Sequence, residues 1–203
     1  MANEPSIIAS AQELFQRFGI RSVTMDDVAH HLGISKKTLY GAAQNKDALV
    51  EKTVGRFISQ KRGAIEHICE QQAAPLSELF SMMGFIASTL GEVSAGMVHD
   101  LQKYHHGGWQ QLSDFYCQYF FEKIKTNLER GAATGDYRAD MKPEFAAMLM
   151  LHVLRLHLRK ELPPFNNSDD FAKNCLDFFL VGMATEQGRE VYRARMQQLS
   201  TDS

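Results

Sequence analysis

The sequence has few of the residues that interrupt or cross-link a folded chain. It contains only 5 prolines and 14 glycines among 203 residues, which leaves little material for long disordered linkers. Its three cysteines, Cys69, Cys117 and Cys175, are odd in number and far apart, so they match neither a disulfide framework nor a zinc-ligand spacing. We expect free thiols in a reducing compartment.

Long apolar runs and a dominant charge are missing as well. No run of about 18 apolar residues could span a membrane, and residues 1–6 lack the basic and apolar regions of a signal peptide. We therefore expect a cytoplasmic protein with no membrane partner. The net charge is only −2, yet the stretch from Val28 to Lys46 contains lysines and no carboxylate. A local basic patch of this kind is sufficient for contact with phosphates.

Strand patterns are almost absent from the chain. There is no sustained alternation of apolar and polar residues and no Asn-Gly or Asp-Gly hairpin turn, whereas apolar residues recur with the helical period nearly everywhere. The pattern predicts an all-α fold of about nine or ten helices. The expected helices cover residues 5–18, 25–32, 36–42, 46–71, 75–90, 93–105, 109–130, 144–160, 168–185 and 188–199.

Two short helices near the N-terminus are separated by a tight turn that contains glycine. Thr24 can cap the first of them in a capping box with Asp27, and Ser35 can cap the second. Gly33 between them tolerates a positive φ. This arrangement describes a helix-turn-helix, whose second helix opens with residues 36–38, Lys-Lys-Thr. In that motif these positions meet base edges; the alternative is a helical hairpin with a solvated lysine pair.

The helices expected at 144–160 and 168–185 are apolar around most of their circumference. A helix of this kind has to be covered on all sides. A second copy of the chain would cover both helices in a two-fold four-helix interface, and burial inside one subunit is the alternative. The residues expected at this homodimer interface are Leu149, His152, Leu156, Leu176 and Phe179.

The helices expected at 75–90 and 109–130 carry more apolar side chains than one packing seam needs. This excess predicts a mostly apolar pocket between the fourth and seventh helices, in which tyrosine hydroxyls orient a small hydrophobic effector. Plain packing of a central helix is the alternative. Gly107 and Gly108 are expected to break the chain, with a tryptophan at the mouth of the pocket. The expected lining residues are Met82, Phe85, Trp109, Phe115, Tyr116 and Tyr119.

Motifs for catalysis and metal binding are missing. The sequence has no Gly-x-Ser-x-Gly elbow, no glycine-rich phosphate loop and no His-Glu-x-x-His motif, so we expect no enzyme and no catalytic residue. His30–His31 and His105–His106 are adjacent pairs, and neighbouring residues on a helix point about 100° apart. Neither pair can hold one metal ion by itself, and we expect no metal and no other cofactor.

Residues 8–49 contain a specific series of residues with fixed internal spacing: Ala11, Leu14, Phe15, Gly19, the run 24–29, the run 33–40, Asn45, Lys46, Asp47 and Leu49. This series resembles the TetR family of transcriptional regulators, and a weaker similarity covers residues 128–144. The resemblance implies a homodimer on a palindromic double-stranded DNA operator, usually a repressor that a small molecule releases. It also implies that Thr24, Tyr40 and Lys46 bind phosphates, while Lys36, Lys37 and Thr38, preceded by Ser35, face the major groove.

One position departs from the family pattern. The family typically has an aromatic residue three positions after the tyrosine, and here Tyr40 is followed by Ala43 at that distance. We expect the Ala43 side chain to face the core of the DNA-binding domain and to be undersized there. Residues 1–50 are then the helix-turn-helix domain and residues 51–203 the ligand-sensing and dimerisation domain. The departure leaves an alternative, a ligand-binding helical dimer with impaired DNA binding.

Overall fold

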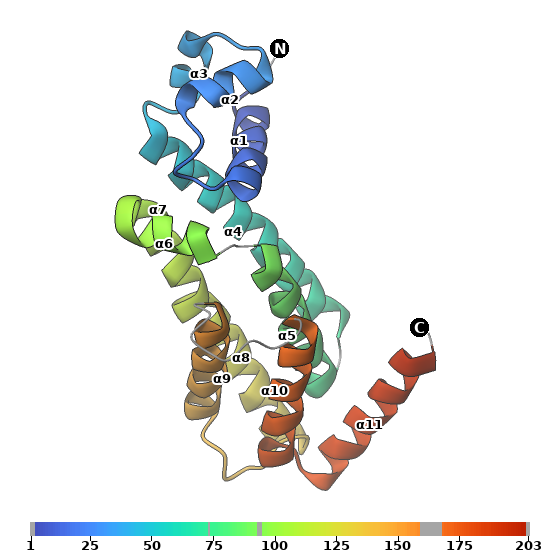
Figure 1. Ribbon diagram of the computed structural model, residues 1–203. Coiled ribbons are helices and arrows are strands. Elements are labelled where there is room, and N and C mark those ends of the chain that lie inside the picture. The colour runs from blue at the N-terminus through green and yellow to red at the C-terminus, as the bar shows by residue number, and fades with distance from the viewer. Residues whose placement is uncertain (1–2, 73, 93–94, 159–167, 202–203) are drawn as a thin grey trace. The chain divides into compact units, whose positions relative to one another are not determined.

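The computed structural model describes residues 3–72, 74–92, 95–158 and 168–201, and they confirm the all-α class (Figure 1). These residues contain no strand; a single isolated antiparallel bridge pairs Tyr137 with Ala184. None of their helices combines the length and apolarity needed to cross a bilayer. The elements are α1 (Glu4–Phe18), α2 (Met25–Leu32), α3 (Lys36–Ala42), α4 (Lys46–Gln71), α5 (Pro75–Glu92), α6 (Ala95–Tyr104), α7 (His106–Asp114), the π-helix η1 (Phe115–Phe120), α8 (Phe121–Thr134), α9 (Pro143–Leu158), α10 (Ser168–Met183) and α11 (Glu186–Thr201).

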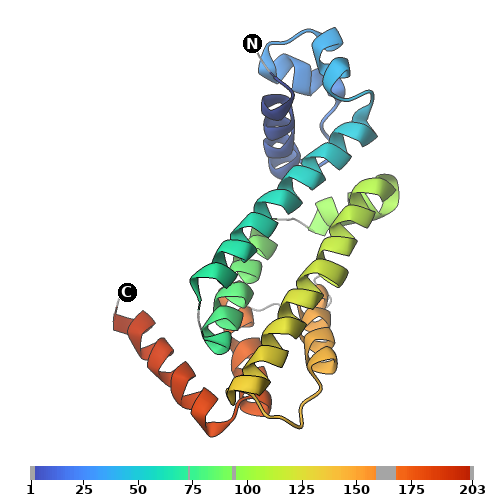
Figure 2. The ribbon, with the colours of Figure 1, turned by 180° about the vertical axis from the view of Figure 1, so that it is seen from behind.

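The chain divides into two compact units. The N-terminal unit comprises residues 1–63 and 92–115, and the C-terminal unit comprises residues 64–91 and 116–203. The helix α4, the long teal helix of Figures 1 and 2, contributes to both units. Helices α6 and α7 belong with α1 to α3 in the N-terminal unit, although they follow them by more than fifty residues. The functional boundary expected at residue 50 stays a prediction.

The helix α1 provides one wall of the three-helix core in the N-terminal unit. Asn3 caps it by accepting from the Ser6 backbone N–H at 3.0 Å, and the helix ends at Gly19 with φ 83°. Its buried residues Ile7, Ala11 and Phe15 are spaced by four, so they lie on one face. Burying a side chain the size of Ile or Phe stabilises the fold by about 1.5–3 kcal/mol. This face holds α2 and α3 in place.

The expected break at Gly107 and Gly108 is wrong. The chain breaks at His105, and both glycines lie in the first turn of α7. A Cβ added at Gly108 would lie 3.1 Å from Leu101 Cδ2 and 3.4 Å from Val50 Cγ1. A side chain at this position would be tightly packed, because α7 lies close to side chains of α6 and α4.

The single helix expected at 109–130 is interrupted by the π-helix η1 and extends further, through α8 to Thr134. Among the described residues, the expected count of about nine or ten helices is confirmed, since α7, η1 and α8 follow one another without a break and form one continuous helical run. Phe115 and Phe120 at the two ends of η1 are both fully buried. Residues five apart point about 140° away from each other on an α-helix, so a wider turn is needed to bury both. A search of the sequence for apolar residues at the α-helical period of 3.6 cannot reveal this wider turn.

A buried polar cluster joins α5, α8 and the segment after α8 in the C-terminal unit. Asn127 Nδ2 donates to Pro75 O at 2.7 Å and to Glu78 Oε1 at 3.1 Å, while Arg130 forms an ion pair with Glu78. The Tyr137 hydroxyl donates to Asn127 Oδ1 at 3.3 Å, and burial raises the pKa of Tyr137 far above its ordinary value. The buried carboxylate of Glu78 thus has the partners that a buried charge requires.

The close packing around Gly131 gives a stability prediction. A Cβ added there would lie 2.2 Å from Cδ2 of the Tyr137 ring and 3.2 Å from Pro75 Cβ. Gly131→Ala should therefore lower the free energy of unfolding by about 1–3 kcal/mol through overpacking. Gly84→Ala is the matched control: it lies in α5 with no atom near the added Cβ, and should be neutral or stabilising by up to about 1 kcal/mol. Urea unfolding followed by circular dichroism measures both; equal stability of the two variants contradicts the prediction.

Candidate nucleic-acid interface

The turn between α2 and α3 has the geometry expected for a helix-turn-helix. Gly33 adopts the left-handed conformation with φ 61°, and the N–H of Ile34 donates to Ala29 O at 3.0 Å. Ser35 then caps α3, since its hydroxyl accepts from the Thr38 N–H at 3.1 Å. The turn fixes the direction in which α3 leaves α2, so it determines which residues of α3 stay exposed.

The start of α2 is held by a complete capping box. Asp27 Oδ2 accepts from the Thr24 N–H at 2.8 Å and from the Thr24 hydroxyl at 2.6 Å, and the Asp27 N–H donates back to Thr24 Oγ1 at 3.1 Å. The Thr24 hydroxyl and N–H lower the pKa of Asp27 below its ordinary value. The stability from this box is thus present at neutral pH and is lost in acid, as Asp27 protonates. Thr24, a predicted phosphate contact, is exposed but already donates its hydroxyl to Asp27.

The helix α3 has one buried and one exposed face. Leu39, Ala42 and Ala43 are buried, and Ala43 is only 3% exposed, which confirms that it faces the core; whether it is undersized stays a prediction. The residues predicted to meet DNA from this segment all lie on the exposed side. They are Ser35, Lys36, Lys37, Thr38 and Tyr40.

The two lysines that open α3 have different surroundings. Lys36 Nζ lies 2.7 Å from Asp26 Oδ2 across the turn, with both side chains more than half exposed. Lys37 is exposed and has no ion pair within the described part of the chain. The sequence pattern does not indicate Asp26 as the ion-pair partner of Lys36. The two residues are ten positions apart on different helices, so no helical spacing relates them. Lys36 therefore approaches any anion together with a carboxylate.

Lys46 lies at the first position of α4 and is half-buried. Its Nζ donates to Arg21 O at 3.3 Å, so the ammonium is tied to the segment between α1 and α2. Partial burial lowers the pKa of Lys46, although the carboxylates of Asp100 and Asp47 oppose this effect. Asn45 caps α4 as expected, since Oδ1 accepts from the Ala48 N–H at 2.8 Å. The cation and the free N–H groups of this helix end form one positive region.

The residues predicted to bind an effector fall into both units. The Tyr119 hydroxyl donates to Glu66 Oε1 at 2.7 Å. This hydroxyl was expected to orient the ligand, but in the structure it is hydrogen-bonded to a carboxylate that the sequence pattern does not indicate. Trp109 and Phe115 belong to the N-terminal unit, and the other four belong to the C-terminal unit. Met82 and Phe115 are fully buried, whereas Phe85, Trp109, Tyr116 and Tyr119 are partly exposed. The role of this set stays a prediction.

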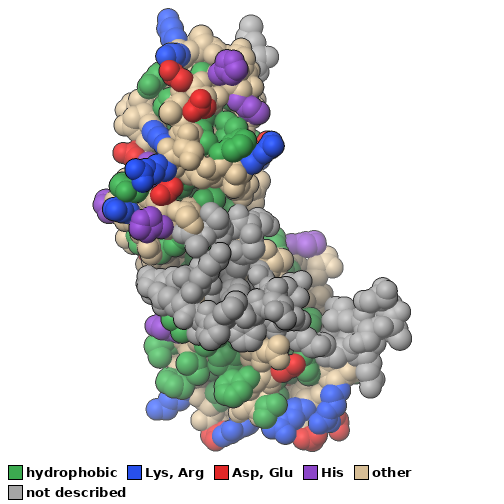
Figure 3. Space-filling view, viewed as in Figure 1, with side chains coloured by type: hydrophobic (Ala, Val, Ile, Leu, Met, Phe, Trp, Pro, Cys, Tyr) green, Lys and Arg blue, Asp and Glu red, His purple; other side chains and the backbone are tan. Residues whose placement is uncertain are grey.

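The residues predicted for the dimer interface divide by helix. On α9, Leu149, His152 and Leu156 are exposed, as an interface requires. On α10, Leu176 and Phe179 are only 3% and 7% exposed, so they lie inside the unit, contrary to the surface position expected for them. The exposed apolar residues of α10 are instead Phe178 at 76% and Val181 at 69%. Figure 3 shows hydrophobic side chains gathered over α9 and α10.

The exposed residues of α3 and the capped turn before it define the class of this N-terminal segment. It is a helix-turn-helix, an element that DNA-binding domains use. Residues 7–53 match the family described as bacterial regulatory proteins, tetR family. The match covers only the N-terminal part of the chain, where the sequence pattern resembles the same family.

Comparisons with individual proteins give a partial sequence match, over less than two thirds of the relative's length, and several similar folds. The chain is 33% identical over 110 residues to the uncharacterized HTH-type transcriptional regulator YvaF of Bacillus subtilis (strain 168), a match that covers 54% of this chain and 57% of that protein. A transcriptional regulator from Saccharomonospora viridis in complex with choline has a similar fold, with a TM-score of 0.77 and 15% identity, over 90% of this chain and 98% of the other. The SmeT–triclosan complex also has a similar fold, with a TM-score of 0.72 and 15% identity; the match covers 90% of this chain and 92% of SmeT. SmeT is the repressor of a Stenotrophomonas maltophilia efflux pump.

The pairing of Lys36 with Asp26 gives a prediction about DNA selectivity. Asp26→Asn should free Lys36 and remove a negative charge from the helix-turn-helix surface, so affinity for random duplex DNA should rise about three- to tenfold at low salt, which corresponds to roughly 1 kcal/mol. The gain should shrink as salt rises. Thermal stability should change little because an exposed ion pair contributes less than about 1 kcal/mol.

Fluorescence anisotropy with a labelled random duplex measures this effect. Glu129→Gln, an exposed charge on α8 in the C-terminal unit, is the charge-matched control and should leave the affinity unchanged. An equal gain in both variants would show that only net charge matters, and no gain in Asp26→Asn would remove the proposed role of this carboxylate.

Proposed function

We propose that this chain is a cytoplasmic transcriptional repressor that binds a palindromic DNA operator as a homodimer and leaves it when a small hydrophobic molecule binds. The observation that supports DNA recognition is the exposed start of α3, where Lys36, Lys37 and Thr38 project from a capped recognition helix. Lysine can donate to guanine O6 and N7, and threonine can contact a thymine methyl. The first residues of this helix are those that meet base edges in the motif.

The positive region around Lys46 supports phosphate contact beside the recognition helix. An anion bound near the N-terminus of α4, beside the Lys46 ammonium, would gain from the helix dipole. Tyr40 is exposed on α3, and its hydroxyl can donate a hydrogen bond to a phosphate of the DNA backbone. A capped α3 with a buried Ala43 favours this function over a dimer with impaired DNA binding.

Dimerisation is supported by the exposed apolar residues of α9 and α10. Monomeric proteins seldom expose a contiguous apolar patch of this kind. A two-fold axis through it would repeat the DNA-binding domain and so match a palindromic operator. The residues of this patch are Phe145, Met148, Leu149, Leu156, Phe178 and Val181.

Ligand release is supported by the complexes of two proteins of similar fold, one with triclosan and one with choline. The proposed effector is mainly hydrophobic, since the predicted lining is apolar apart from two tyrosine hydroxyls and one indole N–H; its residues are Met82, Phe85, Trp109, Phe115, Tyr116 and Tyr119. The hydroxyl of Tyr119 is bound to Glu66, so the polar end of an effector would contact this pair rather than a free phenol. An effector shifts the equilibrium between operator-bound and free protein when it binds more tightly to the conformation that does not bind the operator.

The DNA proposal predicts that Lys36 and Lys37 both contribute to operator affinity. Lys36→Ala and Lys37→Ala should each weaken binding to an operator selected from random duplexes. If the lysine contacts a phosphate, the slope of log K against log salt should become shallower by about 0.9. If it contacts a base, discrimination at one base pair should fall by about 1–3 kcal/mol. Lys142→Ala, an exposed lysine of the C-terminal unit, is the control; unchanged affinity in both α3 variants would refute the proposal.

The dimer proposal predicts that a charge on the exposed apolar face of α10 disrupts the dimer, whereas a charge on exposed α11 does not. Phe178→Glu and Val181→Glu place a charge on the exposed face and should yield folded monomers in sedimentation equilibrium. Gln187→Glu, on an exposed site of α11, should remain dimeric. Circular dichroism verifies that each variant is helical. A dimer that survives Phe178→Glu and Val181→Glu together would place the interface on another surface.

A further inference from the structure

The C-terminal end of α3 is weakly held by its own residues. Helices α1, α2 and α8 end at glycines with positive φ, whereas α3 ends at Ala43 in an extended conformation with φ −148°. Gly41 lies inside α3, where glycine is destabilising relative to alanine. The buried side chains at this end, Ala42 and Ala43, are small and bury little apolar area. The end of α3 therefore depends on a contact from another element.

Lys52 of α4 supplies this contact. Its Nζ donates to Ala42 O at 2.6 Å and to Glu4 Oε1, in the first turn of α1, at 2.6 Å. Ala42 is only 7% exposed, so water has limited access to replace the ammonium there. A cation near the C-terminus of a helix is also favoured by the helix dipole. One side chain thus joins α3 to both α1 and α4.

The two contacts of Lys52 differ in what they contribute. The ion pair with Glu4 is open to solvent, since the two side chains are 40% and 52% exposed, and an exposed pair contributes little stability. The hydrogen bond to Ala42 O reaches a buried residue and comes from a charged donor, which bonds more strongly than a neutral one. The position of the end of α3 therefore depends mainly on the bond to this carbonyl oxygen.

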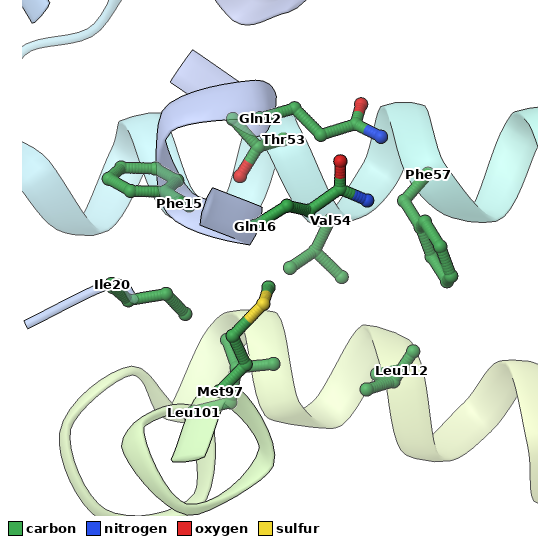
Figure 4. A pocket seen from close by; sticks show the side chains of 10 residues that line it. All are labelled: Gln12, Phe15, Gln16, Ile20, Thr53, Val54, Phe57, Met97, Leu101 and Leu112. Carbon is green, nitrogen blue, oxygen red and sulfur yellow. The ribbon is translucent and has the colours of Figure 1, made fainter. Parts of the chain in front are cut away.

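Lys52 extends from a part of α4 that is packed against α1. The next two residues, Thr53 and Val54, are 5% and 9% exposed. Together with Phe15 of α1 and Leu101 of α6 they line the same small cavity inside the N-terminal unit (Figure 4). The backbone that carries Lys52 is therefore fixed by this core, and the side chain connects the core to the end of α3.

We propose that Lys52 is a positioning residue for sequence-specific DNA recognition. It holds the end of α3 so that the exposed residues at the start of the helix reach base edges, and it does not itself touch DNA. This assignment rests on the proposed function. Base contacts read the sequence, whereas phosphate contacts carry none of it directly, and a recognition site works only when its side chains are held closely in place. Loss of the Lys52 anchor thus weakens binding to the operator much more than binding to random DNA.

Lys52→Met tests this role, because it keeps most of the aliphatic side chain and removes the ammonium. Affinity for an operator selected from random duplexes should fall about tenfold, as expected for one charge-assisted hydrogen bond. Affinity for a random duplex should change less than about twofold, since Glu4 already compensates the charge of Lys52. Fluorescence anisotropy measures both. An equal loss for the two DNAs, or an unchanged operator affinity, overturns the proposal.

Three further variants serve as controls in the same assay. Lys52→Arg keeps the charge and the donors and should retain most of the operator affinity. Glu4→Gln removes only the exposed ion pair and should lower operator affinity less than about twofold. Lys125→Met removes an ion-paired lysine of α8 in the C-terminal unit and should leave both affinities unchanged.

Hydrogen exchange followed by NMR tests the anchor without DNA. The Ala43 N–H donates to Leu39 O inside α3, and the Ile34 N–H donates to Ala29 O in the preceding turn. Lys52→Met should speed exchange at Ala43 about tenfold and leave Ile34 unchanged. Equal acceleration at both amides would show a general loss of stability and overturn the proposal, as would unchanged exchange at Ala43.

NMR of the lysine ammonium groups in the wild type decides if Lys52→Met does not fold. Operator should shift the Nζ resonance of Lys37 and leave that of Lys52 in place; a shift at Lys52 as large as that at Lys37 overturns the proposal. Absence of operator binding by the wild type refutes the proposed function, and the exchange rates then test the anchoring of α3 by themselves.

Discussion

The helix α3 can exist only because it is buried on one side. It has seven residues, whereas isolated helices shorter than about 12–15 residues are marginal in water. Leu39, Ala42 and Ala43 provide its buried face, and Ser35 satisfies one of its free N–H groups. Ile7, Ala11 and Phe15 of α1 form part of the same core. The direction in which the exposed residues of α3 project is thus set by apolar contacts on the opposite side of the helix.

The charges near this helix are arranged in pairs rather than as a uniform basic surface. Lys36 lies beside Asp26, and Lys46 is bound to a carbonyl oxygen close to carboxylates. Lys37 is the residue of this group that is exposed without an ion pair among the described residues. Such an arrangement lowers non-specific attraction to phosphates, since each unit of positive charge is partly compensated. Under the proposed function, specific base contacts would then contribute a larger share of the free energy of operator binding.

In the C-terminal unit, buried polar side chains join the helices through hydrogen bonds. Glu78, Asn127 and Tyr137 are buried, and their hydrogen bonds connect α5, α8 and the segment that follows α8. A buried carboxylate tolerates few rearrangements, because removing one partner leaves a charge uncompensated. The tight contact between Gly131 and the Tyr137 ring restricts the same region. This part of the unit is therefore a rigid support for the neighbouring helices.

The sequence by itself determined the caps and turns of this protein, and the tertiary structure decided which side chains are buried and which remain exposed. Gly33, Ser35 and the Thr24 capping box were predictable because turn and cap chemistry acts over three or four residues. The pairing of Lys36 with Asp26 was not, since it joins two helices. The π-helix η1 escaped a search for a period of 3.6. On α10, apolar residues surround the helix, so periodicity could not distinguish the buried Phe179 from the exposed Phe178; only packing against the rest of the unit separates the two.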